Sequence, residues 1–540
     1  MSVFFLSFCQ IKKNNYLCPK YNFKTINKMF ENQPKGLFAL ALANTGERFG
    51  YYTMLAVFAL FLRANYGLSA GMAGTIYSSF LMFVYFFPLF GGMLADKFGF
   101  GKMVTTGIII MFAGYLLLSI PLGGDTTALV VMLAALLLIG FGTGLFKGNL
   151  QVMVGDLYND PKYADKRDAG FSIFYMAINI GALFAPTAAI KIKEWAETSL
   201  GYSSNDAYHF SFAVACASLI LSIAIYYIFR STFRHTEGGT KKKADNAASG
   251  VAAGEELTKE ETKQRIVALC MVFAVVIFFW MAFHQNGLSL TYFADEFTDH
   301  TVEGVQSMAF DVWNLVLIIF IVYAGFALFQ SKTQKGRGIA AAIIIVAVGL
   351  LVWKYTSLQG ELGIKAPIFQ QFNPFYVVAL TPVSMAIFGY LSAKGKEPSA
   401  PRKIAYGMIV AAAAYALMAL GSMGLPMPQT EMVNGEPVAM HVADVTPNLL
   451  IGTYLILTFG ELLLSPMGIS FVSKVAPPKY KGMMMGGWFV ATAIGNQLVV
   501  VGGLLWGAVP LWLCWSVFLV ICLIAAVFMF AMMKRLEKVC

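Results

Sequence analysis

The chain has 540 residues, of which 58% are apolar and 13% are charged, and its formal net charge is +10. This composition excludes a soluble globular protein and a disordered one, and it predicts an integral membrane protein. Basic residues gather on the cytoplasmic side of membrane helices, so topology explains the positive charge and no nucleic-acid partner is expected. The seven cysteines have no paired or metal-ligand spacing, which predicts neither a disulfide framework nor a metal site.

Hydrophobic stretches of about 20 residues recur along the chain, each bounded by charges or by Gly, Pro and Asn clusters. Helices satisfy their own backbone polar groups in lipid, so we expect an all-α integral membrane protein with fourteen spans in total. The predicted spans are 37–62, 74–95, 102–122, 127–149, 170–190, 208–229, 266–290, 308–330, 338–356, 374–393, 403–423, 447–470, 484–507 and 510–533.

A polar segment, 230–265, separates six predicted spans from eight. Six plus six helices with an additional pair is the arrangement of secondary transporters made from two bundles around a central cavity. We therefore assign an N-terminal six-helix bundle to 36–229, a linker to 230–265 and a C-terminal bundle to 266–534. The additional pair is expected at about 308–356, because these two helices lack polar clusters, and Asp311 is expected to cap the first of them.

The distribution of basic residues predicts that both termini are cytoplasmic. Loops then left outside, such as 295–307 and 424–446, contain no Lys or Arg, whereas Lys191 and Lys193 break the pattern. We expect a multi-pass protein of the plasma (inner) membrane with cytosolic tails at 1–35 and 535–540. The first 28 residues lack a basic region and a convincing cleavage site, so they predict a cytosolic tail or a start at Met29 rather than a signal peptide.

The first predicted span contains the sequence NTGERFGYY, from Asn44 to Tyr52. A charged side chain within the bilayer costs about 2.5–3.5 kcal/mol on insertion scales, so each one is a functional candidate. Asn44, Arg48 and Tyr52 are spaced i, i+4, i+8 and share one helix face, while Glu47 and Tyr51 form the adjacent face. This spacing lets Arg48 and Tyr52 contact one ligand while Glu47 contacts a neighbouring helix.

Three further ionisable residues within predicted spans qualify as functional candidates, namely Lys147, His284 and Glu461. Charges of opposite sign in the two halves suit a cavity that binds a zwitterion, with cations for a carboxylate and an anion for an ammonium group. The alternative is that the charges neutralise one another and hold the bundle together. For Glu47 with Lys147 both interpretations can be true.

The segment 91–103, GGMLADKFGFGKM, resembles the loop signature of the major facilitator superfamily. The resemblance implies that Asp96 caps or pairs across the cytoplasmic helix ends as a gate latch, flanked by Lys97 and Lys102. A plain tight turn with basic flanks is the alternative.

NTGERFGYY itself resembles the Glu-x-x-Glu-Arg-Phe-x-Tyr-Tyr motif of the proton-dependent oligopeptide transporters, a family within that superfamily. Five more segments are similar to motifs of the same family, in the right order across both halves of the chain. They are GTGLFKGN (142–149), FSIFYMAINIGALFAP (171–186), FFWMAFHQNGLSLTYFA (278–294), FQQFNPFYVVALTP (369–382) and GELLLSPMGISFVSKVAPPKYKGMMMGGWF (460–489).

The resemblance implies a major facilitator fold and a symporter that takes up di- and tripeptides with protons, by alternating access and without a cofactor. Arg48 and Lys147 suit the peptide carboxylate, and Glu461 suits the amino group. The remaining substrate-binding residues implied by the motifs are Asn179 and Asn373 for the peptide backbone and Tyr51, Tyr52, Tyr85, Trp280 and Trp488 for the walls. Each aromatic residue, taken alone, is also explained by core packing or interfacial position.

Proton coupling is assigned first to Glu47, which is expected to pair with Lys147 and to take a proton when the peptide carboxylate competes for Lys147 and Arg48. Two departures from the family pattern qualify this mechanism. Asn44 stands where the motif has an acid, and His284 stands where the family usually has Glu. His284 is either a pH-sensing element or a neutral imidazole that forms a hydrogen bond across the gate.

The additional helix pair is also placed unusually, after the span 266–290 rather than before it, and is not expected to contact substrate. Two other functions remain open. One is transport of another small anion or zwitterion such as nitrate or an amino-acid-like solute, and the other is peptide reception without transport. The sequence contains none of the catalytic signatures sought, so an enzyme is not expected.

Overall fold

The computed structural model describes residues 33–238, 258–331, 333–358, 360–433, 436–477 and 480–539, and most of these residues are helical. Thirteen of the described helices are long and apolar enough to cross a membrane. The remaining predicted span, 37–62, lies within α2 (Lys35–Tyr66), and we attribute its lower hydropathy to its charged and polar residues. Residues 1–32 of the predicted N-terminal tail lie outside the described part of the chain.

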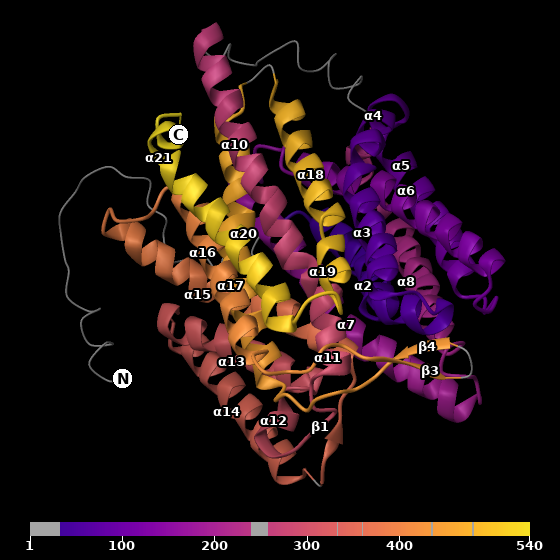
Figure 1. Ribbon diagram of the computed structural model, residues 1–540. Helices are drawn as coiled ribbons and strands as arrows, with labels where there is room; N and C mark the ends of the chain where they lie inside the picture. Colours follow the sequence, from indigo (N-terminus) through magenta and orange to yellow (C-terminus); the bar gives the residue numbers. More distant parts are fainter. Residues whose placement is uncertain are drawn as a thin grey trace.

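The N-terminal half forms one group of packed helices, drawn in indigo and purple (Figure 1). Here α2 packs against α7 and α8, and α5 packs against α6 and α8. Pro88 divides the predicted span 74–95, because a proline has no backbone N–H and is favoured in the first turn of a new helix. The other helices of this half are α3 (Ala70–Phe86), α4 (Pro88–Phe98), α5 (Phe100–Leu118), α6 (Thr126–Asp156), α7 (Arg167–Ser199) and α8 (Tyr208–Ile228), with η2 (Ala164–Lys166) before α7.

The C-terminal half forms a second group, in which α16 packs against α17 and α20, and α10 packs against α18. The predicted span 266–290 breaks at His284, where α10 gives way to a short 3-10 helix, η5. The helices of this half are α10 (Lys259–Phe283), η5 (His284–Gly287), α11 (Ser289–Glu296), η6 (Ala366–Gln371), α15 (Phe372–Ala393), α16 (Ala400–Gly421), α17 (Asn448–Val475), α18 (Lys481–Gln497), α19 (Val500–Leu505), α20 (Leu511–Ala531) and α21 (Met533–Glu537).

The additional helix pair consists of α13 (Val312–Gln330) and α14 (Gln334–Thr356), preceded by α12 (Gly304–Met308). As predicted, Asp311 caps α13: its carboxylate accepts a hydrogen bond of 2.8 Å from the backbone N–H of Trp313. The same carboxylate forms an ion pair with Lys354 of α14. α13 packs against α15 and α7, whereas most of α14 is exposed and is available to lipid.

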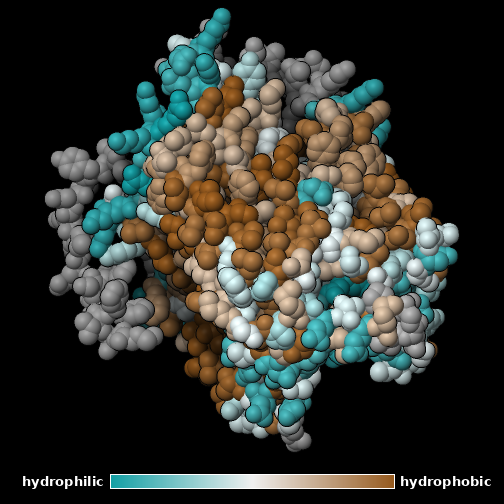
Figure 2. Space-filling model, viewed as in Figure 1, coloured by the Kyte–Doolittle hydropathy of each residue, from teal (hydrophilic) through white to brown (hydrophobic). Residues whose placement is uncertain are grey.

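Two small antiparallel strand pairs lie at one end of the helices, toward the bottom of Figure 1. β1 (Thr301–Val302) pairs with β2 (Leu362–Gly363), and β3 (Thr430–Val433) pairs with β4 (Glu436–Ala439). The space-filling view shows a broad hydrophobic band above them, with hydrophilic residues at both ends of the molecule (Figure 2). A bilayer would occupy this band.

The two lysines that broke the charge pattern are paired with glutamates one turn further along α7. Lys191 lies 2.9 Å from Glu194, and Lys193 forms an ion pair with Glu197. Because α7 continues to Ser199, these pairs lie on the helix beyond the predicted span end at 190. Their positive charges are therefore locally balanced.

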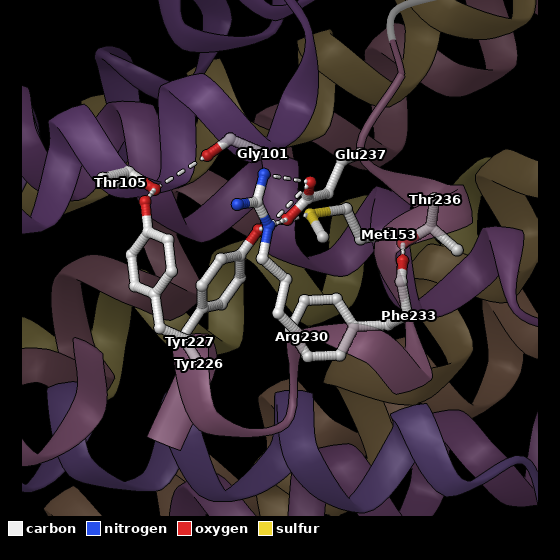
Figure 3. Close-up of polar contacts among 9 residues, drawn as sticks. All are labelled: Gly101, Thr105, Met153, Tyr226, Tyr227, Arg230, Phe233, Thr236 and Glu237. Carbon is white, nitrogen blue, oxygen red and sulfur yellow. Dashed lines mark hydrogen bonds and ion pairs between the residues drawn. The ribbon is translucent and has the colours of Figure 1, made fainter. Parts of the chain in front are cut away.

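The beginning of the predicted linker folds back onto the N-terminal half (Figure 3). Glu237 accepts hydrogen bonds from Arg230 Nε at 2.8 Å and from the Tyr226 hydroxyl at 2.9 Å, and its carbonyl accepts one of 3.2 Å from the Gly101 N–H. These contacts fasten the chain after α8, including η3 (Arg230–Thr232) and η4 (Arg234–Thr236), to the first turn of α5. Linker residues 239–257 lie outside the described part, and α10 begins at Lys259, within the predicted linker.

Candidate functional site

Glu47 and Arg48 of α2 form an ion pair with each other. Arg48 Nε and Nη2 each donate a hydrogen bond of 2.5 Å to one carboxylate oxygen of Glu47, and both residues are buried. The guanidinium carbon also lies 4.6 Å from the centre of the Tyr51 ring. Both charges therefore face protein, as expected for functional residues within a span.

The predicted resting pair of Glu47 with Lys147 is not formed. Instead, Lys147 Nζ of α6 lies 3.7 Å from the centre of the Tyr85 ring, in a cation–π contact. Arg48 gives Glu47 two parallel charge-assisted hydrogen bonds. The ammonium group of Lys147 lacks the planar fork that makes this two-bond contact with a carboxylate. Lys147 nevertheless remains close enough to Glu47 and Arg48 to interact with them electrostatically.

Glu461 of α17 is the buried anion of the opposite half, with an exposed fraction of 7%. Its two oxygens accept hydrogen bonds from neutral groups, the Asn373 side chain of α15 at 3.0 Å and the Tyr175 hydroxyl of α7 at 3.3 Å. The amide of Asn373 also donates to the Thr458 hydroxyl at 3.0 Å. Glu461 is thus held in place by groups that leave its negative charge uncompensated.

Tyr175 is a site residue that the sequence analysis missed. Its side chain is 42% exposed although it lies on a helix that contacts both halves, as expected for a side chain that faces an open space. The signal was present in the sequence, because Tyr175 lies four residues before Asn179 and so shares its helix face. The Asn179 amide donates a hydrogen bond of 3.1 Å to the Tyr175 carbonyl, which places both predicted and missed residues in one turn of α7.

The predicted tyrosines connect the two charged groups. The rings of Tyr51 and Tyr52 pack edge to face with centres 5.2 Å apart. Tyr52 and Tyr85 are half-buried, and each lies close enough to both Arg48 and Glu461 to interact with them electrostatically. The cationic and anionic groups of the two halves therefore border one common region.

His284 lies at the break between α10 and η5 and forms a hydrogen bond within the C-terminal half. Its Nδ1 lies 2.6 Å from Asn496 Oδ1 of α18, and its ring stacks on Trp280 with centres 5.0 Å apart. The Asn496 amide in turn donates to the carbonyl of Leu81 in α3, at 3.4 Å. This geometry fits a histidine that links the two halves through Asn496.

The two tryptophans predicted as cavity walls are both buried, Trp280 against Gly495 and Trp488 against Gly468. Asn44 Nδ2 and Trp280 Nε1 are buried, and neither has a hydrogen-bond partner within the described part of the chain. An unsatisfied buried donor costs about 1–3 kcal/mol, so these two atoms suit contact with water or ligand.

The loop motif lies apart from this charged cluster. Asp96 and Lys97 occupy the last turn of α4, and Lys102 lies in the first turn of α5. All three are exposed, and Lys97 contacts the Phe98 ring. The structure therefore places the motif at a helix end and leaves its predicted latch role untested.

A second buried ion pair joins the two halves and was also missed by the sequence analysis. Arg63 near the end of α2 pairs with Glu296 at the end of α11, and Trp506 Nε1 donates to both Glu296 oxygens at 3.2 Å. Arg63 lies just beyond the predicted span 37–62, and Glu296 lies in a predicted outer loop. Close packing of α3 on α19 accompanies this pair, so the halves meet at this end.

A family model described as the POT family matches residues 101–254 and 350–502, which together make up more than half of the chain. Among curated proteins, the chain is 28% identical over 496 residues to the "Uncharacterized transporter YclF" of Bacillus subtilis (strain 168), covering 87% of this chain and 88% of that protein. It is 25% identical over 498 residues to "Dipeptide and tripeptide permease A" of Citrobacter koseri, covering 88% and 85%.

Among solved structures, the chain resembles the peptide transporter POT in complex with sulfate, with a TM-score of 0.68 and 24% identity. The match covers 94% of this chain and 96% of that one. This likeness over nearly the whole length confirms the predicted two-bundle membrane fold.

Proposed function

Because the chain belongs to the POT family of transporters within the major facilitator superfamily, we propose that it is a proton-coupled symporter that imports di- and tripeptides by alternating access. The observation that supports this best is the pair of opposite charges on separate halves. Arg48 in α2 and Glu461 in α17 are buried and border the same tyrosines. A short zwitterionic peptide can bridge such charges with its carboxylate at one end and its ammonium group at the other.

The amino group of the peptide is assigned to Glu461. Its partners Asn373 and Tyr175 are neutral, so an ammonium group that reaches the carboxylate meets an uncompensated charge. Desolvated charge-assisted hydrogen bonds contribute about 1.5–3 kcal/mol, roughly twice what neutral ones contribute. Recruitment of Asn373 and Tyr175 to the same ligand would draw the two halves together.

The carboxylate of the peptide is assigned to Arg48 and Lys147. Arg48 is engaged by Glu47 at rest, so a ligand carboxylate must compete with Glu47 for the guanidinium. Lys147 on the Tyr85 ring provides a second cation that lies nearby. A carboxylate displaced from Arg48 and left in a dry environment favours the protonated form, and this exchange is our proposal for proton coupling through Glu47.

His284 is proposed to act as the link across the halves, with pH sensing as the alternative. Its hydrogen bond to Asn496, which also contacts Leu81, supports the first role. The predicted walls and backbone ligands keep their assignments, with Tyr175 added: Tyr51, Tyr52, Tyr85, Trp280 and Trp488 as walls, and Asn179 and Asn373 as ligands of the peptide backbone.

Alternating access is supported by the contacts at one end of the helices, where Arg63 pairs with Glu296. If the protein lies in a plasma (inner) membrane with both termini in the cytoplasm, the end that carries the Arg63–Glu296 pair is the outer end. Closure of the outer end corresponds to an inward-facing state. Membership in a transporter family supports transport rather than enzymatic catalysis.

The proposal is tested by uptake of labelled dialanine into liposomes that contain the purified full-length chain, under an inward proton gradient. We expect accumulation that stops when a protonophore collapses the gradient, and no uptake of nitrate. Nitrate uptake without dialanine uptake would favour the anion transporter. Dialanine binding in detergent without counterflow would favour a receptor.

A further inference from the structure

Two histidines lie together at the end of the molecule where Arg63 pairs with Glu296, outside the membrane-spanning segments. His300 follows α11, and His441 follows β4, so they come from loops 295–307 and 424–446 of the sequence. Their ring centres are 4.2 Å apart. Neither loop contains a Lys or Arg, so a proton on this pair would be the positive charge that these two loops lack.

Both ring nitrogens of His441 face hydrogen-bond acceptors. Nε2 lies 2.8 Å from the carboxylate of Asp444, and Nδ1 lies 3.3 Å from the carbonyl oxygen of Asp295. A neutral imidazole has one N–H and can donate to only one of these oxygens, whereas an imidazolium donates to both. The geometry around His441 is therefore complementary to the protonated ring.

The surrounding charges favour one proton on the pair and disfavour two. His300 Nε2 shares the carbonyl of Asp295 at 3.0 Å, so a second imidazolium would lie close to the first, with the ring planes tilted by 39° and the ring centres 4.2 Å apart. The Asp295 side chain interacts electrostatically with both histidines, and also with Arg63 and Lys365. Burial lowers the pKa of His441, but its bonds to Asp444 and Asp295 raise it by more, and the net pKa lies above the ordinary histidine value.

The loop that carries His441 is bonded through its backbone to the segment that carries Glu296. Val442 N–H donates to the Glu296 carbonyl and Val445 N–H to the Phe297 carbonyl, each at 2.8 Å. Asp299 N–H donates to the Val445 carbonyl at 3.0 Å. A bridge from His441 to Asp295 and Asp444 therefore reinforces the attachment of this loop beside the Arg63–Glu296 ion pair.

We propose that His441, with Asp444, the Asp295 carbonyl and His300, forms a second proton-binding site, separate from the central charged cluster, and that a proton bound there fastens the 441–445 loop to the end of α11. The folded state favours the protonated ring, so the bound proton should protect the backbone amides of these two segments against hydrogen exchange. This protection is present at low pH and is lost as the pH rises through the pKa of His441. The site does not require substrate or transport, so its test is independent of the proposed function.

The test is amide hydrogen exchange of the full-length protein in lipid nanodiscs, with wild type and variant compared at the same pH so that the intrinsic pH dependence of exchange cancels. At about pH 6, we expect the segments 296–302 and 441–446 to exchange about two- to fivefold faster in His441→Gln than in wild type, the range given by exposed ion pairs. At about pH 9 the two proteins should exchange alike, which also shows that the variant folds. Asp444→Asn, which keeps the histidine, should show the same faster exchange of both segments at low pH.

His235→Gln is the matched control, because His235 is exposed and lies in η4, far along the chain from both loops. It should leave both segments unchanged. The proposal is overturned if the His441→Gln effect is the same at both pH values, if Asp444→Asn has no effect at low pH, or if His235→Gln accelerates the same segments.

Discussion

The hydroxyl of Tyr175 lies 3.3 Å from Oε1 of Glu461, and this hydrogen bond joins the N-terminal and C-terminal halves. Asn373 of the C-terminal half holds the other oxygen at 3.0 Å. A ligand ammonium group at Glu461 would therefore sit where the two halves meet. Binding there can change the relative position of the halves, which a site within one half cannot do.

Glu461→Gln should weaken the binding of peptides with a free amino group more than the binding of N-blocked peptides. Glutamine keeps a carbonyl oxygen that can accept a hydrogen bond from Tyr175, but it loses the charge. A charge-assisted hydrogen bond contributes about 1.5–3 kcal/mol, so its loss should lower the affinity roughly tenfold or more. The measurement is competition with labelled dialanine uptake by dialanine and by its N-acetyl derivative. Equal losses for both competitors would remove the assigned role of Glu461.

Tyr175→Phe should weaken dialanine binding by a smaller factor, about two- to tenfold. The variant loses one hydrogen bond of about 0.5–1.5 kcal/mol and retains the ring. The half-saturating dialanine concentration in counterflow is the measurement. Tyr202→Phe is the matched control, since Tyr202 and Tyr175 are both 42% exposed. If the two variants behave alike, the bond to Glu461 does not contribute to binding.

Most of the membrane fold could be predicted because hydropathy and length alone mark a helix that must cross lipid. The errors lie at helix ends. α7 continues past Lys191 and Lys193, since each lysine finds a glutamate one turn later, and α10 begins at Lys259 with a capping box formed by Thr258 and Glu261. Such local pairings offset the cost of a charge near the interface, and a hydropathy pattern does not record them.

The charged residues of the site could also be predicted, but their partners could not. Glu47 was expected to bind Lys147 and instead binds Arg48, because the choice depends on side-chain conformation and on Tyr85. The pair of Arg63 with Glu296 joins residues 233 positions apart. Only the packed arrangement of α2 on α11 brings them together.

Glu47→Gln should preserve peptide counterflow and abolish proton-driven accumulation. A glutamine can still occupy the place beside Arg48, but it cannot exchange a proton. Counterflow and gradient-driven uptake of dialanine are to be measured in the same liposome preparation. Glu194→Gln is the control, because Glu194 lies near the end of α7 and pairs with the exposed Lys191. Accumulation that persists in Glu47→Gln would transfer the coupling role to His284.

His284→Gln distinguishes the two roles of that histidine. A glutamine amide can donate to Asn496 Oδ1, so a linking role predicts nearly normal uptake with an unchanged pH profile. A pH-sensing role predicts instead that the variant loses the dependence of uptake on external pH. Uptake by wild type and variant between about pH 5 and 8 measures the difference, since an unperturbed histidine titrates near 6.5.

Gly503 allows the closed end of the molecule to be tested by packing alone. Gly503 of α19 lies against α3, and a methyl group at this position would lie 2.6 Å from the carbonyl oxygen of Ala70. That oxygen belongs to the backbone and cannot rotate away, so Gly503→Ala must separate the two helices slightly. Overpacking of this kind costs about 1–3 kcal/mol, and the cost applies only while the two halves touch here.

Gly503→Ala is therefore expected to shift the population toward states open at this end, by about 5- to 150-fold for that cost. Spin labels at Thr126 and Val305, both exposed, in a chain whose native cysteines are replaced, report the distance between the two halves. Gly349→Ala is the matched control, because a methyl group on Gly349 of α14 would meet nothing within 4 Å. A longer-distance population that grows in Gly503→Ala and not in Gly349→Ala supports the contact of α3 with α19 as part of the closed state. Identical distance distributions in both variants would show that this contact does not hold the end closed, and would leave the Arg63–Glu296 pair as the structural basis of closure.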